Sequence, residues 1–209
     1  PVTNLDGLKN LVSVRCDLTI TAAYTGETLA GLENLTTCES LRIGSTAHPN
    51  ETLRQLSLPA LKEIKGDLCV YGTALQTADF KSLQSVAGHF VLQSDALLQL
   101  TADELTTVAG NMTLIGTTAD EAKAPCEQMY FPKLQRIDGT LTLSRFDRLS
   151  GLGTTFGVLT QAGALRYEHL ALANTFEFPL IETTGNITVT DCPILRSVLL
   201  PALTDAGSL

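Results

Sequence analysis

Residues 58–71, LPALKEIKGDLCVY, contain the pattern that decides the fold of this chain. Apolar residues precede Gly66 at a spacing of three, and apolar residues alternate with other residues after it. Similar stretches occupy residues 80–92, 103–114, 131–143 and 178–190. Gly66, Gly88 and Gly110 are 22 residues apart, and Gly163, Gly185 and Gly207 repeat that spacing. A fixed period of this length indicates a repeat protein whose units pack against their neighbours.

The residues after each glycine alternate with a period of two, which predicts β-strands with one apolar face. The inward-facing pairs are Leu68/Val70, Phe90/Leu92, Met112/Leu114, Leu141/Leu143 and Ile187/Val189. A repeat of 22 residues is too short for a pair of helices and is typical of strand-based solenoids. We therefore predict an all-β fold, a parallel β-helix or leucine-rich-repeat-like solenoid, right-handed because parallel crossovers nearly always are.

The glycine position divides one domain, residues 1–209, into about eight coils. Its occupants are Cys16, Glu39, Gly66, Gly88, Gly110, Gly139, Gly163, Gly185 and Gly207. Apolar pairs such as Leu61/Ile64 and Leu83/Val86 predict a short strand or a turn before each glycine. The glycine then permits either unusual backbone angles or the close passage of one coil over the next.

Two coils carry polar insertions, at about residues 45–55 and 116–130. Solenoids place variable and functional segments in such loops. We therefore expect partner contacts from the insertions, with the candidate residues Ser45, His48, Glu51, Asp120, Glu121 and Lys123.

The composition disfavours several kinds of partner. The 209 residues carry a net charge of -8 and no basic cluster, which disfavours nucleic acid and anionic membrane surfaces. No apolar run reaches the length of about 20 residues that a membrane span needs. The chain starts at Pro1 without the charged start and apolar core of a signal peptide, so we expect a mature fragment.

Four Asn-x-Thr sequons for N-glycosylation favour a secreted or extracellular protein, and they lie at Asn34, Asn50, Asn111 and Asn186. Asn111 and Asn186 share the position directly after the glycine, where the alternation predicts an outward side chain. We expect all four asparagines to face water. The alternative is that these triplets arise because Thr favours strands and Asn favours turns.

The five cysteines fit an oxidising compartment, although they cannot all pair within one chain. Cys16 and Cys38 lie one coil apart at nearly equivalent positions, so they are the favoured disulfide. Cys69 and Cys126 are a second candidate pair, which leaves Cys192 over. The alternative is that some of these residues are small core fillers. The sequence contains no CxxC pair, so we do not expect a structural zinc site. We predict neither a metal nor a cofactor.

The stretches at residues 58–72, 131–144 and 178–203 resemble the repeats of receptor L domains. They are especially similar to fungal and protist cell-surface proteins in which P-x-L-x-x-I-x-G-x-L-x-I recurs. The resemblance covers most of the chain and implies a solenoid exposed on a cell surface or cell wall, often held by a GPI anchor. Receptor relatives of this kind bind protein ligands, but no contact residue transfers to this sequence.

An enzyme on a β-helix needs catalytic side chains clustered on one outward face, and this chain offers few of them. Asp67 and His89, on adjacent coils, are the one pair suited to acid/base chemistry. A surface contact between an aspartate and a histidine is the simpler interpretation. We therefore predict that the chain is not an enzyme.

These features favour a non-catalytic extracellular or cell-surface module for recognition or adhesion, with a protein or glycan partner. The alternative is a structural subunit of a cell-wall, surface or filament assembly. Residues 199–209, LLPALTDAGSL, stop within a repeat phrase and include no polar cap. Uncapped ends of solenoids expose strand edges, so copies could stack end to end as a homo-oligomer.

Overall fold

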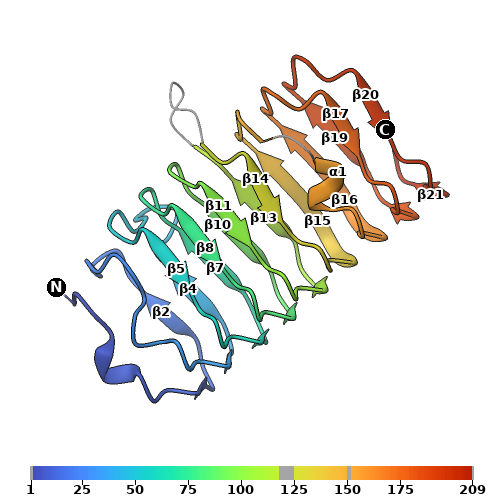
Figure 1. The fold of residues 1–209 in the computed structure, drawn as a ribbon. Coiled ribbons are helices and arrows are strands. Elements are labelled where there is room, and N and C mark those ends of the chain that lie inside the picture. Colours follow the sequence, from blue (N-terminus) through green and yellow to red (C-terminus); the bar gives the residue numbers. More distant parts are fainter. Residues whose placement is uncertain (1, 118–124, 150–151, 209) are drawn as a thin grey trace.

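The computed structural model describes residues 2–117, 125–149 and 152–208. The chain winds into a β-solenoid of about eight turns with a period near 22 residues, as predicted from the glycine spacing. Figure 1 shows the coils stacked between the N-terminus at one end and the C-terminus at the other. Neighbouring coils pair through parallel strands. Each coil contributes up to three strands, and we call the three sides of the coil faces A, B and C in chain order.

Face A carries the strands that precede the glycine position, and face B carries those that follow it. The strands of face A are β1 (Ser13–Val14), β3 (Thr37–Cys38), β6 (Glu63–Ile64), β9 (Ser85–Val86), β12 (Thr107–Val108), β18 (Thr183–Thr184) and β21 (Asp205–Ala206). Those of face B are β2 (Leu18–Ile20), β4 (Leu41–Ile43), β7 (Leu68–Tyr71), β10 (Phe90–Gln93), β13 (Met112–Ile115) and β19 (Ile187–Thr190). Two longer strands, β15 (Arg136–Ser144) and β16 (Gln161–Glu168), run through both faces and join them into one 15-stranded sheet.

Face C carries a third strand in several coils, which the sequence analysis did not predict. Its four-stranded sheet contains β5 (Gln55–Ser57), β8 (Thr77–Asp79), β11 (Gln99–Thr101) and β14 (Gln128–Tyr130). A separate pair contains β17 (Thr175–Glu177) and β20 (Ser197–Leu199). The described residues also form a 3-10 helix, η1 (Asp6–Leu8), and a short α-helix, α1 (Leu152–Thr155), which contacts β14 and β17.

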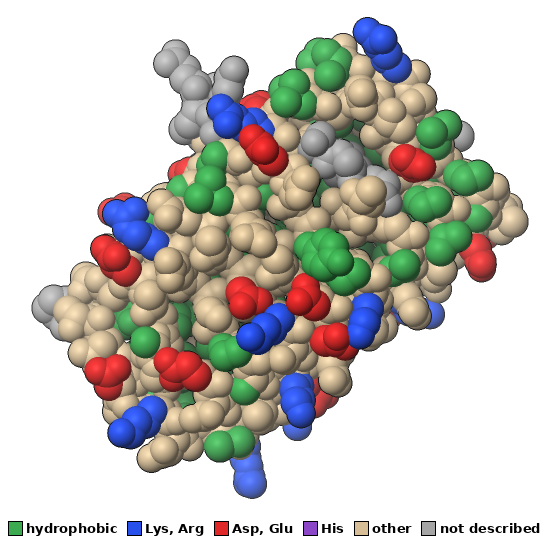
Figure 2. Space-filling view, viewed as in Figure 1, with side chains coloured by type: hydrophobic (Ala, Val, Ile, Leu, Met, Phe, Trp, Pro, Cys, Tyr) green, Lys and Arg blue, Asp and Glu red, His purple; other side chains and the backbone are tan. Residues whose placement is uncertain are grey.

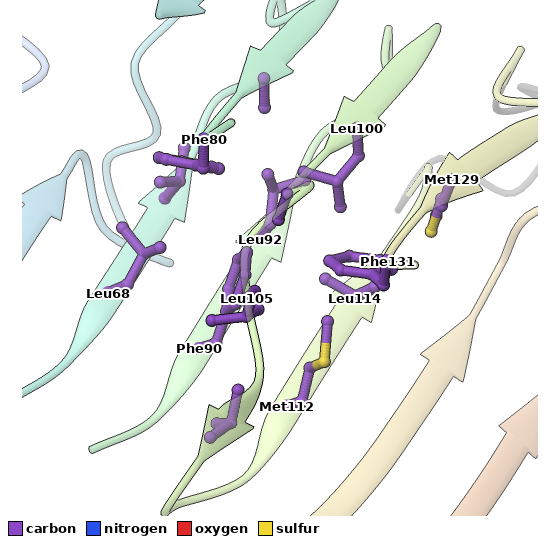
Figure 3. Packing of buried hydrophobic residues seen from close by; sticks show 14 of the residues in the cluster. Leu68, Phe80, Phe90, Leu92, Leu100, Leu105, Met112, Leu114, Met129 and Phe131 are labelled. Carbon is purple, nitrogen blue, oxygen red and sulfur yellow. The ribbon is translucent and has the colours of Figure 1, made fainter. Parts of the chain in front are cut away.

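The core lies inside the coils because the in-register pairing stacks equivalent apolar side chains. Phe90 pairs with Leu68 on one side and with Met112 on the other, and all three are fully buried. Figure 3 shows these side chains together with Leu100 and Met129 from face C. Burying one such side chain stabilises the fold by about 1.5–3 kcal/mol. The predicted inward alternation of face B is therefore what holds the coils together.

Aromatic rings form a continuous line through this core. Ring centroids lie 5.9 Å apart for Phe80 and Phe90, 6.5 Å for Phe90 and Phe131, and 5.5 Å for Phe131 and Phe156. Phe156 and Phe178 continue the line at 6.0 Å. These separations are within the range that favours aromatic pairs. Large rings thus couple coils that are far apart in the sequence.

The periodic glycines permit the close passage of one coil over the next. Among the described glycines, positive φ occurs at Gly31 and Gly44, neither of which occupies the periodic position. The amide of Gly110 donates to the carbonyl oxygen of Gly88 at 2.9 Å. A Cβ at Gly110 would lie only 2.6 Å from that oxygen. Of the two roles considered for these glycines, close passage is the one that the structure shows.

Replacement of Gly110 by alanine should lower the free energy of unfolding by about 1–3 kcal/mol, because the added methyl group forces neighbouring coils apart. Urea denaturation would measure the change. Gly7→Ala is the matched control, since a Cβ there meets nothing within 4 Å, and its stability should be unchanged or slightly raised. Equal stability of the two variants would contradict the role assigned to the glycine corner.

Two buried tyrosines should respond in opposite ways to replacement by phenylalanine. The hydroxyl of Tyr167 is fully buried and has no hydrogen-bond partner among the described residues, whereas that of Tyr24 donates to the carbonyl oxygen of Thr28 at 2.5 Å. Tyr167→Phe should raise the free energy of unfolding by about 1 kcal/mol or more, because an unsatisfied buried hydroxyl costs about 1–3 kcal/mol. Tyr24→Phe should lower it by about 0.5–1.5 kcal/mol. Thermal denaturation of both variants tests the signs, and a destabilised Tyr167→Phe would refute this account of the core.

Candidate functional site

Asp67 and His89 belong to a ladder of side chains at the glycine corner. The backbone amide of His89 donates to Oδ1 of Asp67 at 2.9 Å. The amide of Asn111 donates to Nδ1 of His89, and the amide of Thr140 donates to Oδ1 of Asn111, both at 2.9 Å. Nδ1 of His89 thus acts as a hydrogen-bond acceptor for its neighbour. Oδ1 of Asp67 and Nδ1 of His89 both face the backbone of the next coil.

This ladder has a structural cause. The carbonyl oxygen of Asn111 accepts from the amide of Phe90 in the preceding coil, as that of His89 does from Leu68. The amides of Asn111 and His89 have no carbonyl opposite them, and an orphaned amide is costly unless a side chain accepts from it. A short side chain with an acceptor atom, at the position directly after the corner glycine, accepts this hydrogen bond. The polar column after the glycines is thus explained by backbone hydrogen bonding.

The carboxylate of Asp67 is stabilised in its charged form. The hydrogen bond from the backbone amide of His89 is the main cause that lowers the pKa of Asp67, and a hydrogen bond from Arg42 adds to it. The Arg42 guanidinium lies 2.9 Å from Oδ2 of Asp67 and 3.6 Å from the carboxylate of Asp17. Arg42 therefore links the first three coils through charge.

The sequons fall into two groups. The side chains of Asn34, Asn111 and Asn186 are exposed, as expected for glycan acceptors. Asn50 is fully buried, so the expectation that it faces water is wrong. Its amide nitrogen donates to the carbonyl oxygen of Tyr24 at 3.0 Å, and its Oδ1 accepts from the amide of Leu53 at 2.7 Å. Asn50 thus fastens the first insertion to the coil beneath it, and a glycan cannot occupy its nitrogen in this fold.

All five cysteines are free in the structure, and neither predicted disulfide is formed. The second coil is one residue shorter at its corner, so Cys38 pairs with Val14 and points into the core, while Cys16 is exposed. Cys126 is also fully buried. Burial raises the pKa of the Cys38 and Cys126 thiols to about 11. Both behave as the core fillers that the sequence analysis gave as the alternative.

The candidate contact residues of the insertions are only partly described. In the first insertion His48 and Glu51 are exposed, and the amide of Ser45 bonds to the carbonyl oxygen of His48 at 3.0 Å. Asp120, Glu121 and Lys123 of the second insertion lie outside the described residues. The end of that insertion forms β14, whose Gln128 and Tyr130 face outward from face C. This segment leads to the most distinctive surface of the molecule.

Three hollows follow one another along the outside of face C, and we call them together the face C trough. A hollow of about 570 Å³ lies over β11 and β14. A second, of about 250 Å³, lies over β8 and β11 and shares Gln99 and Thr101 with the first. A third, of about 300 Å³, extends the row to Gln55, Ser57 and Thr28. The trough therefore crosses several coils in succession.

Two columns of outward side chains form the floor of the trough. The in-register pairing aligns the first column, which contains Thr28, Gln55, Thr77, Gln99 and Gln128. The second column contains Ser57, Asp79, Thr101 and Tyr130. Leu98 and Tyr130 give the trough apolar surface, with about half of each side chain exposed, 50% and 54%. The floor thus combines amide and hydroxyl groups with the carboxylate of Asp79 and one aromatic ring.

The sequence analysis missed this surface, although a signal for it exists. Three of the four strands read Gln, apolar residue, hydroxyl residue, at Gln55–Ser57, Gln99–Thr101 and Gln128–Tyr130. Each strand contains one buried residue only, so the apolar alternation that identifies face B has no room to appear. The repeated polar triplet is therefore a better marker of face C than hydropathy.

Within the described parts of the chain, no three His, Cys, Asp or Glu side chains are grouped so that they could hold a metal ion. No helix among the same residues is long and apolar enough to cross a membrane. Comparison with protein-family models, curated proteins and solved structures finds no match to this chain. Its function must therefore be argued from its own surfaces.

Acid should weaken the fold partly through Asp67. Because the folded pKa lies below the unfolded value of about 3.9, the contribution of this carboxylate is present above that pH and is lost as the pH falls through the folded pKa. Asp67→Asn keeps an oxygen acceptor for the ladder but removes the charge, so its stability should change less between pH 5 and pH 3. Chemical denaturation at several pH values would measure this. Glu63→Gln, which removes a carboxylate from face A, is the control and should keep the wild-type acid dependence.

Proposed function

We propose that this chain is a non-catalytic extracellular or cell-surface recognition module that binds its partner through the face C trough. The trough is the observation that carries the proposal. It offers hydrogen-bonding side chains, uncharged apart from Asp79, in register over several coils, together with exposed apolar surface on Leu98 and Tyr130. Binding surfaces commonly combine apolar area with a few well-placed polar groups. A relation to receptor L domains and GPI-anchored surface proteins is part of this proposal.

Two further observations support a binding role outside the cell. Oδ1 of Asp67 and Nδ1 of His89 each accept a hydrogen bond from a backbone amide of the next coil, and Oδ2 of Asp67 bonds to Arg42, so the two side chains have structural partners. Asn111 and Asn186, which lie in sequons, are exposed on the corner between faces A and B. Glycans on these two residues would leave face C open. This favours face C over face B as the side that meets a partner.

Arrays of extracellular proteins and glycans, probed with the purified chain, would test the proposal. We expect binding to at least one array component, and Gln99→Arg, which fills the trough with a charged side chain, should weaken that binding at least tenfold. Thr113→Arg on face B is the matched control and should bind as the wild type does. An absence of binding, equal loss in both variants, or chemical turnover of a bound component would overturn the proposal.

Assembly through the ends of the solenoid is a second candidate, favoured by one observation. Large apolar side chains are exposed in the last coils, at Leu172, Leu180, Ile194, Val198 and Leu199. Figure 2 shows hydrophobic side chains gathered toward this end, whereas charged side chains of both signs are scattered over the visible face. Exposed apolar area beside a strand edge favours association. Sedimentation of the wild type and of Leu199→Lys would test this, because only the wild type should associate; a monomer at all concentrations would contradict it.

A further inference from the structure

The face C trough has the geometry of a track for a linear polymer. Its floor residues repeat once per coil, at the spacing of paired strands, about 4.8 Å. From Thr28 to Gln128 the first column spans five positions, or about 20 Å. A ligand that repeats its own groups at nearly the same interval would meet the same kind of side chain at each step.

An extended peptide does not fit this interval. Side chains on one side of an extended chain recur about every 6.6–6.8 Å, which falls out of step with a coil spacing of about 4.8 Å. Extended peptides also bind by adding a strand at a sheet edge. The trough instead lies over the outer surface of β8 and β11, whose strands are already paired on both sides with neighbouring coils. A ligand here must bind through side chains.

The chemistry of the lining selects against anionic polymers. The three hollows are lined by four carboxylates and one ammonium group, namely Glu33, Asp79, Asp103, Glu127 and Lys81. An anionic polymer would meet this negative excess at close range, which is unfavourable. The floor between the charges consists of amide and hydroxyl groups, which both donate and accept hydrogen bonds. Hydroxyl groups on a ligand match such side chains without requiring a charge.

Tyr130 and Leu98 add the apolar part of the site. Their exposed side chains belong to the largest of the three hollows, next to Gln99 and Gln128. A tyrosine ring provides a rigid surface that is apolar on its face and polar at its tip. The ring of a sugar has the matching form, with C–H groups on its faces and hydroxyl groups around its edge. One hexose unit in an extended chain is also close in length to one coil.

We infer that the face C trough binds an uncharged, hydroxyl-rich linear polysaccharide that lies along the solenoid axis. Each coil then contributes one amide or hydroxyl side chain of the first column to successive sugar units, and Tyr130 stacks on a sugar ring near the β14 end. This inference rests on the proposed recognition function and names the class of its ligand.

Calorimetric titration with neutral oligosaccharides of increasing length, from β-glucan and from chitin, tests the inference. Affinity should rise with chain length and level off once the trough is filled. Tyr130→Ala and Gln99→Ala should each weaken binding about tenfold or more. Gln93→Ala, which removes an outward glutamine from β10 on face B, is the matched control and should leave affinity unchanged. Circular dichroism of each variant would verify that the fold is intact.

Three results would overturn the inference. They are preferential binding of heparin, equal loss of affinity in Gln93→Ala, and a failure of every neutral oligosaccharide to bind. In the last case the array experiment separates the two proposals. If Gln99→Arg still blocks an extracellular protein on the array, the recognition function stands and the polysaccharide does not. If the wild type binds nothing on the array, both fail.

Discussion

The close contact between neighbouring coils at the glycine corner is the constraint on which the rest of the structure depends. The amides of most corner glycines bond to the corner carbonyl of the coil before them, as Gly88 does to Gly66 and Gly110 does to Gly88. Such an approach leaves no room for a Cβ. This contact fixes the spacing between neighbouring coils and the register in which their strands pair. Because register determines which side chains align, this contact also determines the composition of every column in the solenoid.

Equivalent side chains of successive coils align in columns, and each side of the solenoid has columns of a different chemical kind. Inside, alignment produces the line of phenylalanine rings and the stacked leucines. At the corner, it places a side-chain acceptor opposite each amide that lacks a carbonyl, as in Asp67, His89 and Asn111. On face C, it arranges amides and hydroxyls in rows. The proposed recognition by face C relies on this repetition, and a ligand that repeats its own groups would match it.

The sequence predicted those parts of the fold in which a single physical requirement, such as burial of one strand face, produces a recognisable residue pattern. Alternation around Leu68 and Phe90 identified face B, because burial on one side of a strand enforces it. Prediction from the sequence failed where the loss of a single residue changes the pairing register between two coils. The shortened corner of the second coil moves Cys38 opposite Val14 and out of reach of the predicted pairing. The exposure of Asn50 was predicted wrongly, because a single sequence does not distinguish an exposed asparagine in a sequon from one that is buried and hydrogen-bonded.

The sequence also failed to identify the face C trough as the candidate site. Sequence arguments favoured the insertions as contact regions, since polar loops usually carry function. In the structure the first insertion is fixed from within by Asn50, while a row of hollows follows the regular strands of face C. Strands of three residues with one buried side chain give two outward positions per coil and leave those positions free of packing demands. In face C these free positions carry glutamine, threonine, serine, tyrosine and one aspartate in register, and core packing does not require this selection of residues. The proposed recognition role of face C depends on this repeated polar choice, because packing leaves it unconstrained.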